Sequence, residues 1–359
     1  MGHLRRKVER GAVWTLLLHG VSMLVELSIT VILARLLSPY DFGIAAAAML
    51  FMGFIYIFSE IGVAPTIVRI DNLNRNDLRA ALTICLGVSA LCVILTYVSS
   101  PWVASALHMP EAAGPLRALS VIFLFRGVST ISEAKLQRDL SVKEYKIAQI
   151  LARMFGYGLF SAAFAWLGYG YWSIVYGAII EEGLRAVALS VIARIPLSFT
   201  FKIDQLKRVA GSSVGFTAVT LVNFFALNGD TAIVARATDA VSTGLYSRAF
   251  KLMSFPTTLY SRVADQVIFP AFANLQSNPD RLRNAFLEAT TLSALIGLPL
   301  SVMIVMLGPN LILFLYGDEW TSAIPVFAGL SLGAFARFAT RTSGSALRAV
   351  GAVRPMLVC

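Results

Sequence analysis

The chain has 359 residues, of which 57% are hydrophobic and only 14% are charged, and its mean hydropathy of +0.73 excludes an ordinary soluble domain. The formal net charge of +10 comes from basic residues in short segments between apolar runs, a pattern that argues against a nucleic-acid-binding face. Cys85, Cys92 and Cys359 have neither disulfide nor metal-ligand spacing, so we predict no metal site and no cofactor.

Apolar runs long enough to span a membrane recur along the whole sequence. A spanning helix needs about 20 mostly apolar residues, and continuous runs favour helices over the alternating strands of a barrel. The first run is too long for a signal-peptide core and is expected to remain as a span. We therefore predict an all-α polytopic membrane protein with spans near residues 12–34, 42–65, 80–103, 116–132, 147–167, 171–193, 209–235, 241–270, 285–307 and 322–340.

The segments between these runs predict the orientation of the chain. With a cytoplasmic N-terminus, the inside segments hold twenty Lys and Arg residues, whereas the outside segments hold three, Arg35, Arg117 and Arg236. Such an excess of positive charge on one side is typical of the cytoplasmic face. We expect a multi-pass protein with its N-terminus in the cytoplasm.

An internal repeat relates the two halves of the sequence. Because an even number of spans separates the copies, both have the same orientation, as in a parallel repeat. The repeat predicts two pseudo-symmetric six-helix lobes around a central cavity, with a pseudo-two-fold axis along the membrane normal. The matching pairs include Ile32-Leu33-Ala34-Arg35 with Ile233-Val234-Ala235-Arg236, Gly43 with Gly244, Leu78-Arg79 with Leu282-Arg283, and Arg126 with Arg337.

The repeat also predicts the domain boundary. Residues 1–200 form the N-terminal lobe with transmembrane helices 1–6, and residues 201–359 form the C-terminal lobe with helices 7–10 and the start of helix 11. Counterparts of residues 147–193 would fall after Cys359. We therefore expect an incomplete second lobe, from a truncated form of a protein with at least twelve spans.

Two groups of polar residues within the spans are candidates for binding a substrate. A charge at the bilayer centre costs about 2.5 to 3.5 kcal/mol, so such residues tend to mark a site or a path. His19 and Ser22 share one face of the first span with Glu26, although a lone His is also explained by a hydrogen bond to a neighbour. The spacing of Arg248, Lys251 and Arg262 predicts a basic wall for an anion, unless Arg248 and Lys251 snorkel to an interface.

Acidic residues in the spans are candidates for coupling transport to an ion. Glu26 and Glu60 either take up coupling protons or pair with a nearby Arg, and Asp265 is a third candidate. The remaining intramembrane charges are interpreted as ion pairs or as residues near the inner interface: Arg126, Arg153, Arg185, Arg337, Glu181 and Glu182. The sequence has no phosphate-binding glycine loop, nucleophile elbow or metal-ligand cluster, which favours a transporter over an enzyme.

The segment Leu33-Ala34-Arg35-Leu36-Leu37-Ser38-Pro39-Tyr40-Asp41-Phe42-Gly43 resembles the signature of the Wzx-type polysaccharide flippases of the multidrug/oligosaccharidyl-lipid/polysaccharide exporter superfamily. Gln137-Arg138-Asp139-Leu140 also fits that family. The favoured role of the first segment is structural, as a tight outer turn in which Arg35 ends one helix, Pro39 starts the next and Asp41 lies in its first turn.

The resemblance implies a function in lipopolysaccharide or exopolysaccharide biosynthesis. Such a transporter flips an undecaprenyl-diphosphate-linked oligosaccharide from the cytoplasmic to the periplasmic leaflet of the bacterial inner membrane by alternating access. Its partners would be this lipid-linked oligosaccharide, membrane lipids, and a polysaccharide polymerase and glycosyltransferases. The alternative is a cation-coupled multidrug exporter of the same superfamily, whose cavity is expected to be acidic.

Overall fold

The computed structural model confirms the all-α fold class. It describes residues 2–59, 63–70, 73–196, 198–202, 204–206, 214–263, 268–276 and 278–350, and every regular element in these ranges is helical. The chain forms two compact units, residues 1–244 and 245–359. The predicted lobe boundary after residue 200 remains a prediction.

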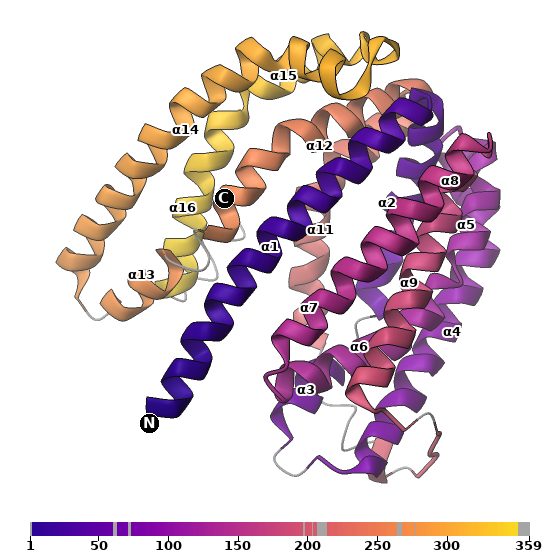
Figure 1. The fold of residues 1–359 in the computed structure, drawn as a ribbon, viewed down its shortest axis with the longest axis vertical. Coiled ribbons are helices and arrows are strands. Elements are labelled where there is room, and N and C mark those ends of the chain that lie inside the picture. The colour runs from indigo at the N-terminus through magenta and orange to yellow at the C-terminus, as the bar shows by residue number, and fades with distance from the viewer. Residues whose placement is uncertain are drawn as a thin grey trace. The chain divides into compact units, whose positions relative to one another are not determined.

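The first unit is a bundle of helices (Figure 1), and its buried core mixes large apolar side chains with alanines. Its central helix α6 contacts both α4 and α9, and α2 contacts α4 and α11. The elements are α1 (Gly2–Leu36), α2 (Pro39–Ser59), α3 (Val63–Arg69), α4 (Arg75–Ala106), a 3-10 turn (Pro110–Ala112), α5 (Ala113–Leu119), α6 (Ile122–Arg138), α7 (Val142–Leu151), a π-helix (Ala152–Leu159), α8 (Phe160–Trp166), α9 (Trp172–Ala193), α11 (Val214–Ala237) and the first turn of α12 (Ala240–Val263).

The second unit contains the rest of α12 and the helices that follow it. Its longest element, α14 (Pro279–Tyr316), packs against α15 (Ala323–Leu332) and α16 (Ala334–Val350), and α16 also contacts the short α13 (Phe269–Leu275). Asn278 caps α14, because its side chain accepts a hydrogen bond from the Arg281 amide at 3.1 Å.

The helices are long and apolar enough for a multi-pass membrane protein. Six of those in the described residues meet the length and hydropathy expected of a span, and the bent pair α15 and α16 would make a seventh. Each of the ten predicted spans falls largely on a helix or a broken helix. α9 carries Glu181, Glu182 and Arg185 in its middle, which lowers its mean hydropathy.

The turn predicted between the first two spans is confirmed. α1 ends at Leu36 with Arg35 in its last turn, and α2 begins at Pro39 with Asp41 in its first turn. The Asp41 carboxylate accepts hydrogen bonds from the Ser38 amide at 3.0 Å and the Ser38 hydroxyl at 2.7 Å. These bonds satisfy groups that the start of a helix leaves without partners.

Candidate functional site

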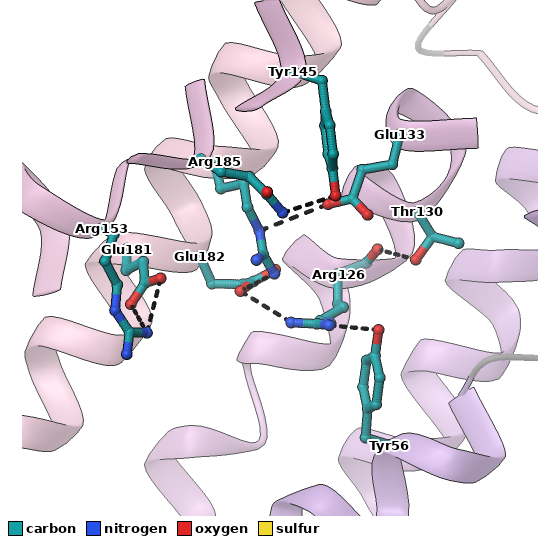
Figure 2. A network of polar contacts seen from close by, with 10 residues as sticks. Tyr56, Arg126, Thr130, Glu133, Tyr145, Arg153, Glu181, Glu182 and Arg185 are labelled. Atoms are coloured by element: carbon teal, nitrogen blue, oxygen red, sulfur yellow. Dashed lines mark hydrogen bonds and ion pairs between the residues drawn. The ribbon is translucent and has the colours of Figure 1, made fainter. Parts of the chain in front are cut away.

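A cluster of ionisable side chains lies inside the first unit, among its long helices (Figure 2). At its centre is Arg126, in the second turn of α6. Its guanidinium carbon lies 3.9 Å from the centre of the Tyr56 ring on α2. Its Nη2 donates a hydrogen bond of 2.5 Å to the Tyr56 hydroxyl. Stacking and hydrogen bonding together fix this cation against α2.

Glu182 on α9 joins two arginines. Its carboxylate lies 3.5 Å from Arg126, and both of its oxygens accept hydrogen bonds from the Nη2 of Arg185, one turn along the same helix. The Arg185 Nε lies 4.0 Å from Glu133, which follows Arg126 by two turns on α6. The side chain of Glu182 is only 7% exposed, so these contacts are largely shielded from solvent. The cluster therefore ties α6 to α9 by alternating charges.

A second branch of the cluster centres on Arg153, in the π-helical segment. Arg153 lies 3.0 Å from Glu181 on α9 and 3.7 Å from Glu26 on α1, and its side chain is 34% exposed. A Cβ added at Gly156 would lie 2.4 Å from the Cα of Glu181, so only glycine permits this close approach of α9. Segments of π-helix within α-helices often occur at functional sites.

The cluster holds three arginines and four glutamates, and each lies within 4.0 Å of at least one residue of opposite charge. At 3.5 Å an ion pair is worth about 5 kcal/mol at an effective dielectric constant of 20, before the cost of desolvation is subtracted. Arg126 and Arg185 share Glu182, whereas the Arg153 and Glu26 side chains are both about one-third exposed. The contacts of Arg126, Glu182 and Arg185 are suited to holding α6 and α9 together. The contact between Arg153 and Glu26 is accessible enough for these side chains to exchange partners.

These contacts confirm the interpretation of Arg126, Arg153, Arg185, Glu181 and Glu182 as ion-paired residues. Tyr56 and Glu133 were not among the residues predicted from the sequence. Glu133 lies seven residues after Arg126, on the same helix face. That spacing was the signal that could have identified it.

The second unit has its own cationic and polar groups. Arg248 and Lys251 lie half-buried on α12, where Arg248 interacts electrostatically with Tyr316. Arg337 on α16 stacks over Phe250, with its guanidinium carbon 4.9 Å from the ring centre. Three cations therefore lie on α12 and α16 within one unit.

A hydroxyl triad links α12, α14 and α16 in the second unit. The Thr342 hydroxyl lies 2.7 Å from the Ser293 hydroxyl and 3.1 Å from the Tyr260 hydroxyl. The Tyr260 and Ser293 hydroxyls are also hydrogen-bonded to each other. Thr342 and Ser293 are buried. The triad satisfies polar groups that would otherwise be costly at this depth.

Several predicted site residues stay predictions. His19 and Ser22 lie half-buried on α1, two turns and one turn before Glu26. Of the two alternatives for Glu26, the pairing with an arginine is seen, at Arg153. The side chain of Arg262 and the residues Glu60 and Asp265 lie outside the described part of the structure.

Comparison with known proteins identifies relatives along most of the chain. The family model "Polysaccharide biosynthesis protein" matches residues 32–325. The succinoglycan biosynthesis transport protein ExoT of Rhizobium meliloti is 22% identical over 91% of this chain and 66% of its own length. The lipopolysaccharide biosynthesis protein WzxC of Escherichia coli is 22% identical over 96% of this chain and 70% of its own length. The teichuronic acid biosynthesis protein TuaB of Bacillus subtilis is 21% identical over 98% and 73%.

Solved structures share the fold. The lipid II flippase MurJ, in an inward closed conformation, superposes with a TM-score of 0.78 at 14% identity, covering 97% of this chain and 78% of that one. An inward-facing multidrug resistance MATE transporter gives 0.69 at 14% identity, over 94% and 83%. By its family match, which covers most of the sequence, the chain belongs to the polysaccharide biosynthesis protein family.

Proposed function

We propose that this chain flips a lipid-linked oligosaccharide between the leaflets of a bacterial membrane during polysaccharide biosynthesis. The cargo moves from the cytoplasmic to the periplasmic leaflet of the inner membrane by alternating access, and the N-terminus is cytoplasmic. The family match over residues 32–325 carries this proposal. It is supported by the excess of Lys and Arg on the predicted inner side. The chain spans about two thirds to three quarters of the length of its relatives.

The diphosphate of the cargo needs cations at membrane depth. Arg248, Lys251 and Arg262 lie on α12 and are proposed to hold it, because guanidinium groups bind phosphate oxygens in pairs. His19 and Ser22 on α1 are proposed to donate hydrogen bonds to sugar hydroxyls.

The driving ion is proposed to act at carboxylates. Glu26 is the best-supported candidate, since it is one-third exposed and shares Arg153 with Glu181. Protonation of Glu26 would release its hold on Arg153 and loosen α1 from the π-helical segment. Glu60 and Asp265 complete the proposed set. A polymerase and glycosyltransferases are the proposed partners, because they supply and consume a lipid-linked saccharide.

Complementation tests this function. A bacterial strain that lacks its polysaccharide flippase would receive the wild-type gene or the Arg248→Ala/Arg262→Ala variant, and surface polymer would be measured with membrane levels of the protein. We expect polymer with the wild type and its loss with the variant at equal protein level. Arg281→Ala, at the exposed start of α14, is the matched control.

Two outcomes would contradict the proposal. Polymer made at the wild-type level by the double variant would remove α12 as the diphosphate site. Failure of the wild type to restore polymer, together with increased resistance to hydrophobic cations, would favour the multidrug exporter instead.

A further inference from the structure

α7 and α9 lie side by side in the first unit (Figure 1), and an apolar groove of about 560 Å³ runs between them. Small side chains form its floor, because Ala148 and Ala152 are buried and Ala188 is half-buried. Large apolar side chains of α7, the π-helical segment and α9, each 36 to 47% exposed, form its walls: Ile147, Leu151, Phe155, Leu184 and Ile192. A groove of this volume is large enough to hold a small ligand.

The groove is as long as one leaflet of a bilayer. Its lining extends from Glu144 in the first turn of α7 to Phe155, which is about 16 Å at a rise of about 1.5 Å per residue. The hydrocarbon of one leaflet is about 15 Å thick, which is half of the bilayer core. A single acyl chain can therefore cover the walls of the groove from end to end.

Basic residues surround the end of the groove at which α7 begins and α9 ends. Lys143 is exposed in the first turn of α7, and Arg194 is exposed as the C-cap of α9. Lys135 at the end of α6 donates a hydrogen bond to the Ala193 carbonyl, which brings a third cation to the end of α9. Segments 134–146 and 193–195 together hold five cations against two carboxylates: Lys135, Arg138, Lys143, Lys146 and Arg194 against Asp139 and Glu144.

An anionic phospholipid matches both the apolar walls and the basic end of the groove. Its acyl chain matches the walls, and its phosphate matches the cations, since guanidinium and ammonium groups bind phosphate oxygens. Glu144 lies at the same end and repels a phosphate, but the cations outnumber the carboxylates there. A zwitterionic phospholipid carries a cation of its own, so a basic surface attracts it less.

We propose that this groove binds a phospholipid with an anionic headgroup from the surrounding bilayer. One acyl chain lies between α7 and α9, and the headgroup meets Lys143 and Arg194. The orientation proposed above places this end on the cytoplasmic side, where the leaflet is rich in anionic lipids. Binding of this lipid goes beyond the proposed function, because it requires no cargo.

The lipid site also borders the segment that carries Arg153. Ala152 and Phe155 line the groove and belong to the π-helix, as does Arg153, which lies near Glu181 and Glu26. An acyl chain in the groove therefore packs against the segment on which these ion pairs depend. The lipid is expected to hold that segment at its present distance from α9.

Native mass spectrometry of the purified full chain tests the site. The protein in detergent would be titrated with phosphatidylglycerol and, separately, with phosphatidylcholine of the same acyl chains, and the Kd of the first bound lipid would be measured. We expect phosphatidylglycerol to bind the wild type about tenfold or more tightly than phosphatidylcholine. Equal Kd values for the two lipids would overturn the proposal.

Lys143→Gln/Arg194→Asn removes two cations from the end of the groove. Asn suits position 194, because Arg194 has a left-handed backbone with a φ of 50°. Each cation near an anionic surface contributes about fivefold to affinity, so we expect phosphatidylglycerol to bind about tenfold or more weakly. The control Arg69→Gln/Arg75→Gln removes two exposed cations from α3 and α4 and should keep the wild-type Kd. An equal loss in both double variants would overturn the site.

Ala188→Phe fills the floor of the groove without changing the charge. We expect it to weaken the binding of both lipids about fivefold or more, whereas Ala163→Phe, at an exposed position of α8 outside the groove, should leave both Kd values unchanged. If Ala188→Phe does not fold, the charge variants still decide the question.

Two further outcomes separate this site from the cargo. Displacement of phosphatidylglycerol from the wild type by an equal concentration of undecaprenyl phosphate would overturn the proposal, because the groove would then hold the lipid tail of the cargo. Binding as expected in a chain that restores no polymer would support the lipid site and refute only the proposed function.

Discussion

Replacing Glu182 by Gln removes the carboxylate that Arg126 and Arg185 share. The substitution keeps the shape of the side chain, while Arg126 keeps its contact with Tyr56 and Arg185 keeps Glu133 at 4.0 Å. The lost attraction at 3.5 Å is about 5 kcal/mol at an effective dielectric constant of 20. Relief of the desolvation of Glu182 offsets part of it, and breaking a buried ion pair typically costs about 3 to 5 kcal/mol. We expect a loss of about that size.

The assay is reversible unfolding of the purified protein in mixed micelles. Glu144→Gln is the control, because Glu144 is exposed in the first turn of α7, and it should change the free energy of unfolding by less than about 0.5 kcal/mol. Adding Arg126→Gln to Glu182→Gln should recover part of the loss, since no unpaired cation then remains at that position. A loss below about 1 kcal/mol for Glu182→Gln would refute the view that the cluster holds α6 to α9.

Three further predictions concern other parts of the chain. Glu26→Gln should lower the free energy of unfolding by about 1 kcal/mol or less, because its pair with Arg153 is one-third exposed; wild-type polymer export by this variant would exclude Glu26 from coupling. Thr342→Val should cost about 1 to 3 kcal/mol by leaving the Ser293 and Tyr260 hydroxyls short of a partner, and exposed Thr340→Val should cost much less, both measured by unfolding. Hydrogen bonds from Ser242 hold the pKa of Asp239 below its ordinary value of 3.8, so its stabilisation is fully present above pH 3.8 and is lost as the pH falls through the folded-state pKa. Asp239→Ala should therefore cost about 1 kcal/mol at neutral pH and less in strong acid, and an equal cost at both would contradict a role for the ionised cap.

The sequence repeat identifies equivalent positions in the two copies, but it does not predict the contacts between them. Gly43 and Gly244 were paired by their offset in the sequence alone, and the structure brings both into one crossing. The offset identifies equivalent positions but says nothing about whether they touch. That depends on where the two-fold axis passes, which is set by the packing of the whole bundle.

The charged residues illustrate the same division. The free-energy cost of a charged side chain in the bilayer predicts that Arg126, Arg153 and Glu182 form ion pairs, and each of them does. The choice of partner was not predictable, because Arg126 and Tyr56 are 70 residues apart in the sequence. Only the packing of α2 against α4 and α6 brings them together.

The sequence by itself determined that this protein is helical and lies in a membrane, because long apolar runs must satisfy their backbone within each helix. Its loop charges predict an orientation, and its spacing predicts a repeat. The tertiary structure decided which charges pair, where α9 can approach the π-helical segment, and that two equivalent glycines meet. These features depend on distances between helices, and such distances arise only when side chains far apart in the chain pack together.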